Sequence, residues 1–589
     1  MCGIVGTITN NHANDIVLEG LKRLEYRGYD SCGITYADGD VLKVVKSVDR
    51  IKDLREQVNA SASISFGHTR WATHGGVNLE NAHPHLTSDK KMAIVHNGVI
   101  ENFEQLRADY CDEDTLQSET DTEVILYTLY HFYQKTGEMK AAINEFMNVV
   151  HGSYALIVYL TDTPNIVYTL KNKSPLLIGK NEGLVTISSD PSAVIDRVSD
   201  FYQMDDKKYA LINTEDYTIS LFEQDGSEID LVLETIDMDY EEVSTQEYDT
   251  FMEKEIEEQP KAMRNIVENY KTLGFDGKLM DTVKSASRIY IVASGTSFNA
   301  GLISKDIIEN KLRIPVEVVL GSEFGYSENI ISEGSFFIFL SQSGETADSM
   351  LVFNQVKGKY PILAITNVRG SQMDRNADFS LNIFAGIEVA VASTKAYTAQ
   401  IAVVAMLMYT IAGDATIYDQ LLEVANNQEK VISEKEQFVA IANHLKDFRE
   451  VFYLGRLQDY ALCEEASLKI KEISYINVSS FAAGELKHGT ISLIDPTKLT
   501  VALVNDPKVA ENTRSNVQEV RARDGEVLIF STTDTERSGD TYVVTANCDT
   551  QLKPLVTILP HQYLALHTAK LLDLDVDKPR NLAKAVTVE

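Results

Sequence analysis

The chain has 589 residues, of which 44% are hydrophobic and 24% are charged, as in folded globular proteins. Its 54 basic and 87 acidic residues give a net charge of −33, which repels phosphate backbones and argues against a nucleic-acid partner. No uninterrupted run of roughly eighteen apolar residues predicts a membrane span, and the length predicts about two to four domains.

The cysteines and the N-terminus indicate the expected compartment. The five cysteines form no CxxC pair and lie at Cys2, Cys32, Cys111, Cys463 and Cys548. An odd, dispersed set predicts a reducing cytoplasm and argues against a structural zinc site. No basic region precedes an apolar run at the N-terminus, so no secretory signal is expected.

Residues 1–238 show the pattern of an antiparallel α+β domain. Short strands rich in β-branched and aromatic residues are expected at 65–67, 92–96 and 153–160, with turn signals at 37–40 and 224–226. Helical periodicity covers residues 15–26 and 121–135. Residues 239–250 are polar and acidic with no clear period, which predicts a linker.

The pattern changes after residue 250. Near-continuous apolar strands alternate with helices, which is typical of parallel sheets covered on both faces. The strands are expected at 289–293, 336–340, 362–366, 451–454, 500–504 and 527–530. The pattern occurs twice, so we expect two similar α/β units at residues 251–425 and 426–579, followed by a tail at 580–589.

Cys2 is the first candidate for chemistry. Once Met1 is removed, Cys2 carries a thiol and a free α-amine, whose pKa of roughly 7.7–8.0 suits a general base near neutral pH. An ordinary buried cysteine is the alternative for this residue alone.

Three further motifs in the first domain suit amide hydrolysis. Arg70, in HTRWATHG, could clamp a carboxylate, and Asn97-Gly98 could form an oxyanion hole, although an Asn-Gly turn competes. Asp121, in SETDTE, could hold an ammonium group, although this sequence is also a helix cap.

The order of these motifs, together with Arg27-Gly28-Tyr29-Asp30-Ser31, closely resembles the class II, N-terminal-nucleophile glutamine amidotransferases over residues 2–125. The resemblance implies a layered αββα sandwich. It also implies that Cys2 is the nucleophile and that Asn97 and Gly98 form the oxyanion hole. Arg70 and Asp121 would bind the two charged ends of glutamine, and Thr73 and His74 would line the same pocket.

Two loops in the second half suit a phosphate. Ser294-Gly295-Thr296-Ser297 and Ser341-Gln342-Ser343-Gly344-Glu345-Thr346 each lie between an expected strand and a helix, where hydroxyls and free backbone N–H groups meet. Simple helix capping is the alternative for either loop. The matching turn 504–508 of the second unit has no hydroxyl cluster, so one phosphate site per chain is expected.

Lys469 and Glu472 are spaced to share a helix face, and His488 lies in a Gly-flanked loop. Taken alone, these residues fit a solvated ion pair and a structural histidine. With the 388–395 segment EVAVASTK and the ending DKPRNLAKAVTVE, however, the arrangement closely resembles the two sugar-isomerase (SIS) domains of the glutamine–fructose-6-phosphate aminotransferase family. This implies two doubly wound, parallel-sheet α/β domains after the sandwich.

The resemblance assigns roles to individual residues. Phosphate and sugar would be bound by Ser297, Ser341, Gln342, Ser343, Thr346 and Val391. Lys584 would form a Schiff base with the ketose, Glu472 would move a proton between C1 and C2 with help from Lys469, and His488 would open the ring. Ammonia passage would be gated by Trp71 and Ala583.

By the same resemblance, the substrates are L-glutamine and D-fructose 6-phosphate. The products are L-glutamate and D-glucosamine 6-phosphate, at the start of amino-sugar biosynthesis. No cofactor is expected, neither pyridoxal phosphate nor metal, and the chain is expected to be a cytoplasmic homodimer paired through its isomerase half. The sequence departs from the family's usual Gly, Pro and Gly at Leu457, Thr490 and Ala390.

Other functions fit less well. A phosphoribosylamine-forming amidotransferase would need a phosphoribosyltransferase second half, which the two similar units argue against. A sugar-phosphate-sensing regulator would not need Lys584, Glu472 and His488, and a DNA-binding one would carry a basic segment. A deglycating relative acting on fructosamine phosphates would normally lack the domain that contains Cys2.

Overall fold

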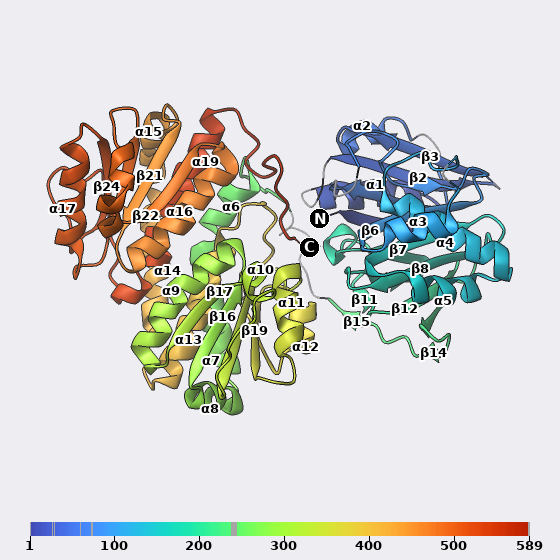
Figure 1. Cartoon of the computed structure of the whole chain (residues 1–589), viewed down its shortest axis with the longest axis horizontal. Helices are drawn as coiled ribbons and strands as arrows, with labels where there is room; N and C mark the ends of the chain where they lie inside the picture. The colour runs from blue at the N-terminus through green and yellow to red at the C-terminus, as the bar shows by residue number, and fades with distance from the viewer. Residues whose placement is uncertain are drawn as a thin grey trace. The chain divides into compact units, whose positions relative to one another are not determined.

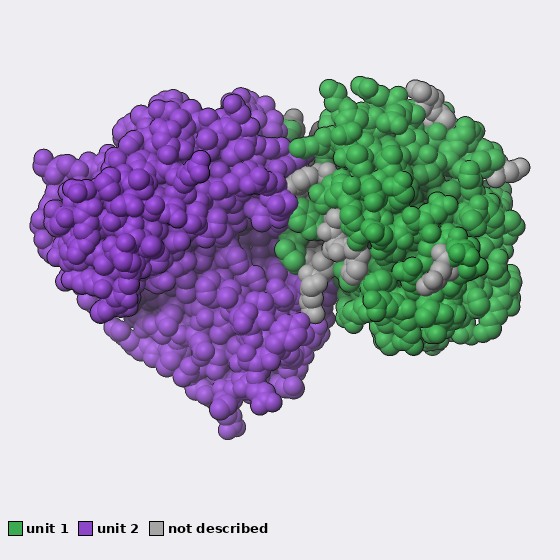
Figure 2. Space-filling view, turned by 45° about the horizontal axis from the view of Figure 1, so that its top comes forward, with its two compact units in different colours: residues 1–244, 585–588 green, residues 245–584, 589 purple. Residues whose placement is uncertain are grey.

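The computed structural model describes residues 2–25, 28, 30–39, 41–58, 61–71, 75–112, 114–236 and 244–586. The chain forms two compact units, one of residues 1–244 and 585–588 and the other of residues 245–584 and 589 (Figure 2). Part of the expected 239–250 linker lies outside the described residues, and the finer domain boundaries stay a prediction.

Within its described residues, the first unit contains two antiparallel sheets (Figure 1). The eight-stranded sheet has the spatial order β15 (Glu234–Thr235), β11 (Asp200–Gln203), β9 (Leu177–Asn181), β10 (Leu184–Ser188), β1 (Gly3–Thr9), β4 (Ile64–Arg70), β2 (Ser31–Asp38) and β3 (Val41–Ser47). The seven-stranded sheet has the order β14 (Glu228–Ile229), β13 (Ile219–Glu223), β12 (Lys208–Asn213), β8 (Ile166–Asn172), β7 (Gly152–Leu160), β6 (Met92–Ile100) and β5 (His85–Leu86).

The two-residue period of β7 places it between two cores. Ala155 and Ile157 face the core between the sheets, whereas Tyr154, Leu156 and Val158 face the core under the helices. The helical elements of this unit are α1 (Ala13–Leu24), α2 (Ile51–Arg55), α3 (Phe103–Tyr110), α4 (Asp121–Thr136), α5 (Met139–Val149) and η2 (Pro191–Ala193). Because α1 packs on β1 and β4 while α4 packs on β6, the predicted αββα order is confirmed.

Within the described part of the chain, the second unit holds two five-stranded parallel sheets with the same strand order. The first sheet runs β17 (Val316–Leu320), β16 (Arg288–Ala293), β18 (Ser335–Ser341), β19 (Ile362–Thr366) and β20 (Phe379–Asn382). The second runs β22 (Asn477–Ala482), β21 (Glu450–Gly455), β23 (Leu499–Val504), β24 (Glu526–Thr532) and β25 (Tyr542–Val544). The predicted doubly wound α/β repeat is confirmed.

Helices cover both parallel sheets and share one apolar core. Around the first sheet and joining it to the second are α6 (Phe251–Glu257), α7 (Gln259–Leu273), α8 (Gly277–Ser285), α9 (Gly295–Leu312), α10 (Gly321–Phe324), α11 (Ala347–Val356), α12 (Gln372–Asn376), α13 (Lys395–Ile411), α14 (Ile417–Ser433) and α15 (Glu436–Leu445). The remaining elements are α16 (Gln458–Ser474), η4 (Ala483–His488), η5 (Thr490–Leu493), α17 (Ala510–Arg521), η6 (Thr550–Leu552), α18 (Pro554–Thr557) and α19 (Leu559–Leu571). The expected boundary at 425/426 falls inside α14, which packs against α7 and α19.

The largely apolar helix α13 lies in the interior of the second unit. Its side chains from Lys395 to Tyr409 are all buried inside the protein, so the helix is covered on every side. No described helix combines the length and hydropathy needed to cross a bilayer.

Candidate functional site

Cys2 lies directly before β1 and is half-buried. Its Sγ accepts a hydrogen bond from the Trp71 backbone N–H at 3.2 Å. Burial raises the pKa of the Cys2 thiol, and the Trp71 N–H and the charge of Arg70 offset only part of that rise. Because only the thiolate is strongly nucleophilic, a buried thiol of this kind needs a base beside it.

Strand pairing brings Arg70 to the same end of the sheet. Gly3 pairs with Thr69 of β4, and its N–H donates to the Thr69 hydroxyl at 3.1 Å. Arg70, the last residue of β4, is 3% exposed. Its guanidinium donates to the backbone carbonyls of Gly76 at 3.0 Å and Gly75 at 3.2 Å.

The Asn97–Gly98 pair lies within β6 rather than in a turn, so the turn alternative is excluded. The Asn97 side-chain amide donates to the Cys2 carbonyl at 3.0 Å, which leaves its second N–H for another acceptor. Gly98 has a φ of +143°, and a Cβ there would lie 2.0 Å from the Ser153 carbonyl oxygen. Only glycine therefore fits at this position.

Asp121 begins α4 and is 4% exposed. One of its carboxylate oxygens accepts the Ile100 N–H at 2.9 Å, which fixes Asp121 at the end of β6. The expected cap is also present, because the Thr120 hydroxyl accepts the Glu123 N–H. The sequence SETDTE thus both caps the helix and positions Asp121.

A buried group of four histidines near this site was not predicted. The rings of His68 and His83 stack with centroids 4.1 Å apart, and His83 meets His85 at 5.0 Å. His96 bonds the Thr122 hydroxyl at 2.9 Å. Burial lowers the pKa of His68 to about 3 and those of His83 and His85 well below their usual value. His68, His83 and His85 are therefore neutral at pH 7. Thr73 and His74, the other residues predicted for the glutamine pocket, lie outside the described residues.

In the second unit, the hydroxyl-rich loops lie at the ends of parallel strands as predicted. Ser341 ends β18; its Oγ accepts the Gly344 N–H and shares a hydrogen bond with the Thr346 hydroxyl, both at 3.0 Å. The Ser343 Oγ accepts the Glu345 N–H at 3.2 Å, and Gln342 is half-buried beside it. Ser297, in the first turn of α9, accepts from the Gln400 amide at 3.0 Å.

Lys469 and Glu472 form an ion pair at 2.7 Å on α16, and Lys469 is fully buried. A third charged residue, Glu465, was not predicted although it precedes Lys469 by one helical turn. Its carboxylate lies 3.3 Å from the Lys469 Nζ and accepts from the Asn299 amide at 2.8 Å. Burial raises the pKa of Glu465 to about 7.

Thr296 connects this charged group to the phosphate-type loop. Its hydroxyl accepts from the Lys469 Nζ at 2.9 Å and donates to Glu465 at 3.2 Å. Since Thr296 and Ser297 are neighbours in the first turn of α9, the structure joins the candidate phosphate-binding and proton-moving residues.

Lys584 has a buried side chain and a carboxylate partner that sequence reasoning missed. Its Nζ donates to Glu388 at 2.5 Å and to the Ser393 hydroxyl at 3.0 Å. Glu388 also accepts the N–H groups of Thr394 and Ala396. Although burial opposes ionisation, Lys584 and these donors lower the pKa of Glu388 to about 2.

The segment around Glu388 is held at several points. The Val391 N–H donates to the Asp577 carbonyl, shortly before the tail, at 3.1 Å. The Asp577 carboxylate accepts the N–H groups of Phe251 and Met252 at the start of α6. Glu255 of α6 accepts the N–H groups of Val389 and of Ala390, one of the departures from the family pattern.

Other predicted residues are not brought into this group. His488, at the end of η4, is exposed, and within the described chain it has no hydrogen bond or ion pair to another predicted site residue. Trp71 and Ala583 are half-buried and belong to different units, so their gating role stays a prediction. No group of three or more His, Cys, Asp or Glu residues among those described is arranged for a metal.

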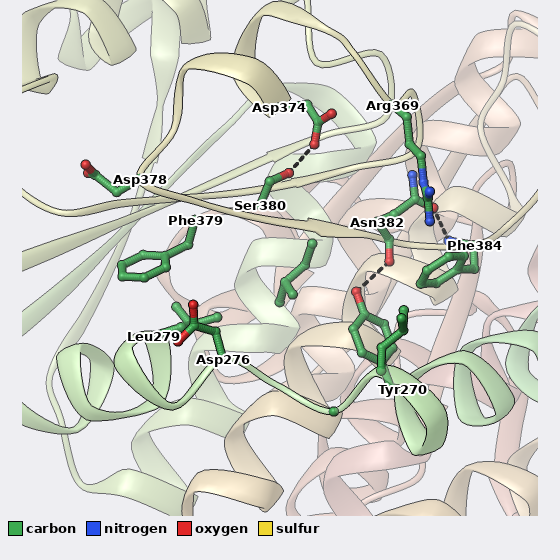
Figure 3. Close-up of a pocket in the computed structure, with 13 residues that line it drawn as sticks. Tyr270, Asp276, Leu279, Arg369, Asp374, Asp378, Phe379, Ser380, Asn382 and Phe384 are labelled. Carbon is green, nitrogen blue, oxygen red and sulfur yellow. Dashed lines mark hydrogen bonds between the residues drawn. The ribbon is translucent and has the colours of Figure 1, made fainter. Parts of the chain in front are cut away.

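A separate cavity of about 480 Å³ lies between α7, α8 and β20 (Figure 3). The Tyr270 hydroxyl donates to the Asn382 carbonyl at its wall, and Arg369 lies over the ring of Phe384. None of the predicted sugar-site residues lines it.

Both units of the chain match families of known proteins. A glutamine amidotransferase domain matches residues 44–225, and a SIS domain matches twice, at residues 282–409 and 444–569. The glutamine–fructose-6-phosphate aminotransferase (isomerizing) of Listeria innocua is 44% identical over 606 aligned residues, and that of Streptococcus pyogenes is 42% identical over 610. Both alignments cover all of each chain. This chain belongs to the glutamine–fructose-6-phosphate aminotransferase family.

A solved structure supports the fold of the second unit. The C-terminal domain of the glucosamine–fructose-6-phosphate aminotransferase from Francisella tularensis is 32% identical, with a TM-score of 0.55. The match covers 57% of this chain and all of that domain. A tagatose-6-phosphate ketose/aldose isomerase from Escherichia coli shares the fold at 17% identity and a TM-score of 0.50, over 56% of this chain and 95% of that one.

Proposed function

We infer that this chain transfers the amide nitrogen of L-glutamine to D-fructose 6-phosphate, giving D-glucosamine 6-phosphate and L-glutamate. The similarity to the aminotransferases over the whole of both chains carries this conclusion, because it includes both units. The reaction starts amino-sugar biosynthesis, and the residue roles below are our proposals for how the geometry performs it.

In the first unit, the Cys2 thiol attacks the side-chain amide carbon of glutamine. Its proton passes to the α-amine freed by removal of Met1, which the raised pKa of the thiol requires. Asn97 and Gly98 stabilise the oxyanion, while Arg70 and Asp121 bind the carboxylate and ammonium groups of glutamine. Ammonia leaves, and water hydrolyses the thioester to glutamate.

In the second unit, the hydroxyl-lined loops bind the phosphate and His488 opens the sugar ring. Glu388 pairs with the Lys584 Nζ and orients it; in its unprotonated form the amine attacks the C2 ketone and water is released. Ammonia then replaces Lys584 at C2. Glu472 takes a proton from C1 and returns it to C2, with Lys469 holding the carboxylate in place.

The finer organisation rests on the family resemblance. We propose a cytoplasmic homodimer joined through the SIS domains, with ammonia passing from Cys2 to Lys584 without release. The chemistry needs neither a metal nor pyridoxal phosphate, because Lys584 supplies the imine.

Two variants separate the half-reactions. Cys2→Ala should produce no glutamate from glutamine. Mass spectrometry should still detect a covalent adduct of this variant with fructose 6-phosphate after reduction by borohydride. Lys584→Met should keep glutamine hydrolysis and lose the trapped adduct, whereas Lys578→Met, just before the tail, should keep both. Glutamate from Cys2→Ala, or an adduct on Lys584→Met, would contradict the assignment.

A further inference from the structure

The two parallel-sheet units can be compared position by position. β16 and β21 each have six residues, so Arg288 matches Glu450 and the two strands end together. The eighth residue from each start is Gly295 in one unit and Leu457 in the other, with φ values of +54° and +53°. Both units therefore have a positive φ at the same position, and the tenth residue is Ser297 in the first unit and Asp459 in the second.

The neighbouring strands give a second match. β16 pairs with β18 through Ile289 and Phe336, and β21 pairs with β23 through Val451 and Leu499. Counting from these pairs, the loop residues Gln342 and Ser343 correspond to Asn505 and Asp506. Ser297 and Gln342–Ser343, all predicted to bind phosphate, thus match Asp459 and Asn505–Asp506.

In the second unit, the corresponding place already holds a negative charge. One Asp459 oxygen accepts the backbone N–H groups of Asn505 at 2.8 Å and Asp506 at 3.4 Å. The other oxygen accepts from the Asn505 side-chain amide at 2.8 Å. Asp459 is 4% exposed. The backbone N–H groups that follow β23 therefore donate to a buried carboxylate instead of to solvent or a ligand.

The rest of the loop is also fixed around this contact. The Asn505 carbonyl accepts from the Lys553 Nζ at 2.9 Å and from the Thr532 hydroxyl at 3.2 Å. Asp459 itself lies in the first turn of α16, where a negative charge is favourable. Residues 465, 469 and 472 follow on the same helix, so the contact anchors the N-terminal end of the helix that holds Lys469 and Glu472.

We propose that Asp459 is the built-in anion of the second unit: it takes the place that phosphate takes in the first unit and anchors α16. Each chain would then bind a single sugar phosphate, because the Asp459 carboxylate occupies the equivalent position in the second unit. Asp459 is a positioning residue, since it acts on the sugar reaction through α16. The inference rests on the proposed function for its sugar-site half.

Asp459→Ser tests this by giving the second unit the residue of the first. Inorganic phosphate should slow hydrogen exchange of the 504–510 segment in this variant but not in the wild type. Asp459→Asn, which keeps the place filled, should show no such protection. Asp506→Ser is the matched control, because it removes one charge from the same loop without emptying the contact.

Activity gives the second readout. Asp459→Ser should lower the kcat of glucosamine 6-phosphate formation about tenfold at saturating fructose 6-phosphate, and phosphate should restore part of it. Glutamine hydrolysis without sugar should stay unchanged.

The possible failures are distinguishable. Absence of phosphate protection at 504–510 in Asp459→Ser would overturn the proposal that the Asp459 carboxylate occupies the place of a phosphate. An unchanged kcat in this variant would overturn the proposal that Asp459 anchors α16. Phosphate that fails to protect 341–347 in the wild type, or wild-type protein that forms no amino sugar, would instead count against the proposed function.

Discussion

The proposed glutamine and sugar-phosphate sites hold their charged side chains in different ways. In the first, Arg70 donates to two backbone carbonyls and Asp121 accepts a backbone N–H. In the second, the buried lysines face carboxylates: Lys469 lies between Glu465 and Glu472, and Lys584 is paired with Glu388. Backbone groups thus contact both charged side chains of the first site, whereas in the second site the buried lysines pair with carboxylates, one of which, Glu388, also accepts backbone N–H groups.

This difference matches the chemistry of the two substrates. Glutamine brings both a carboxylate and an ammonium group, and the guanidinium of Arg70 and the carboxylate of Asp121 are complementary to them. The sugar reaction moves protons among an amine, C1 and C2, and for this purpose neighbouring acids and bases must exchange charge. The predictions below test this contrast.

Removing Arg70 should have the largest effect. In Arg70→Ala, a glutamine carboxylate would lose its buried partner, which costs roughly 2–5 kcal/mol, so kcat/KM for glutamine should fall about 10²–10³-fold. Arg70→Lys should recover only part, because an ammonium cannot form the two-pronged contact. Borohydride trapping of the imine between Lys584 and the sugar should be unaffected. A parallel loss of trapping would contradict the assignment of Arg70 to the glutamine site alone.

Glu388→Gln should give a smaller effect, confined to the sugar site. We expect kcat for amino-sugar formation to fall about tenfold to a hundredfold, because a neutral amide holds the Lys584 Nζ less firmly than the carboxylate does. Imine trapping by borohydride should fall in parallel. A variant with unchanged kcat and unchanged trapping would show that Glu388 does not position Lys584.

Two buried titratable groups, His68 in the first unit and Glu465 in the second, should contribute opposite responses to pH. The folded-state pKa of His68 is lowered to about 3, so its contribution to stability is complete above about pH 6.5 and lost as pH falls. The pKa of Glu465 is raised to about 7, so its contribution is complete below about pH 4.5 and lost as pH rises through 7. Each slope is at most about 1.4 kcal/mol per pH unit.

Hydrogen exchange at pH 5, 7 and 8 can measure each unit separately. His68→Phe should flatten the acid-side loss of protection in the first unit only, and Glu465→Gln should flatten the alkaline-side loss in the second unit only. An effect of either variant in the other unit, or none in its own, would overturn the assignment.

Leu457→Gly should have the smallest effect and should be stabilising. Leu457 is 54% exposed with φ +53° and ψ −125°, a conformation that suits glycine. Relief of roughly 1–3 kcal/mol of strain exceeds the entropic cost of glycine, about 0.5–1 kcal/mol, so urea unfolding should shift up by about 1 kcal/mol. Leu493→Gly, at an exposed leucine in η5, is the control and should destabilise.

Local patterns were sufficient for much of the fold. The helix predicted at 121–135 is α4, Asp121–Thr136, because its cap and its apolar spacing lie in consecutive residues. The predicted 289–293 strand matches β16, and the paired units were visible as two repeats of strand–helix alternation. For α1, the prediction of 15–26 lies two residues later than the observed Ala13–Leu24, since the helix lacks a side-chain cap to mark its start.

The charged partners could not be predicted in the same way. Glu388 lies 196 residues from Lys584, and Thr296 lies 173 residues from Lys469. Glu465 was within reach, because four-residue spacing to Lys469 on a helix is a local signal. Asp459 gave no such signal, since a carboxylate near a helix start reads as an ordinary first-turn residue.

The sequence by itself determined the family, the order of the domains and the residue types that the two reactions need, because these are written in motifs and periodic spacing. Only the tertiary structure decided which charge faces which. The packing of β6 from one sheet against β1 of the other places the Asn97 amide nitrogen 3.0 Å from the Cys2 carbonyl oxygen, and helix packing places Lys469 against Thr296. Burial then sets the protonation of these groups, since the cost of a buried charge depends on neighbours distant in the chain.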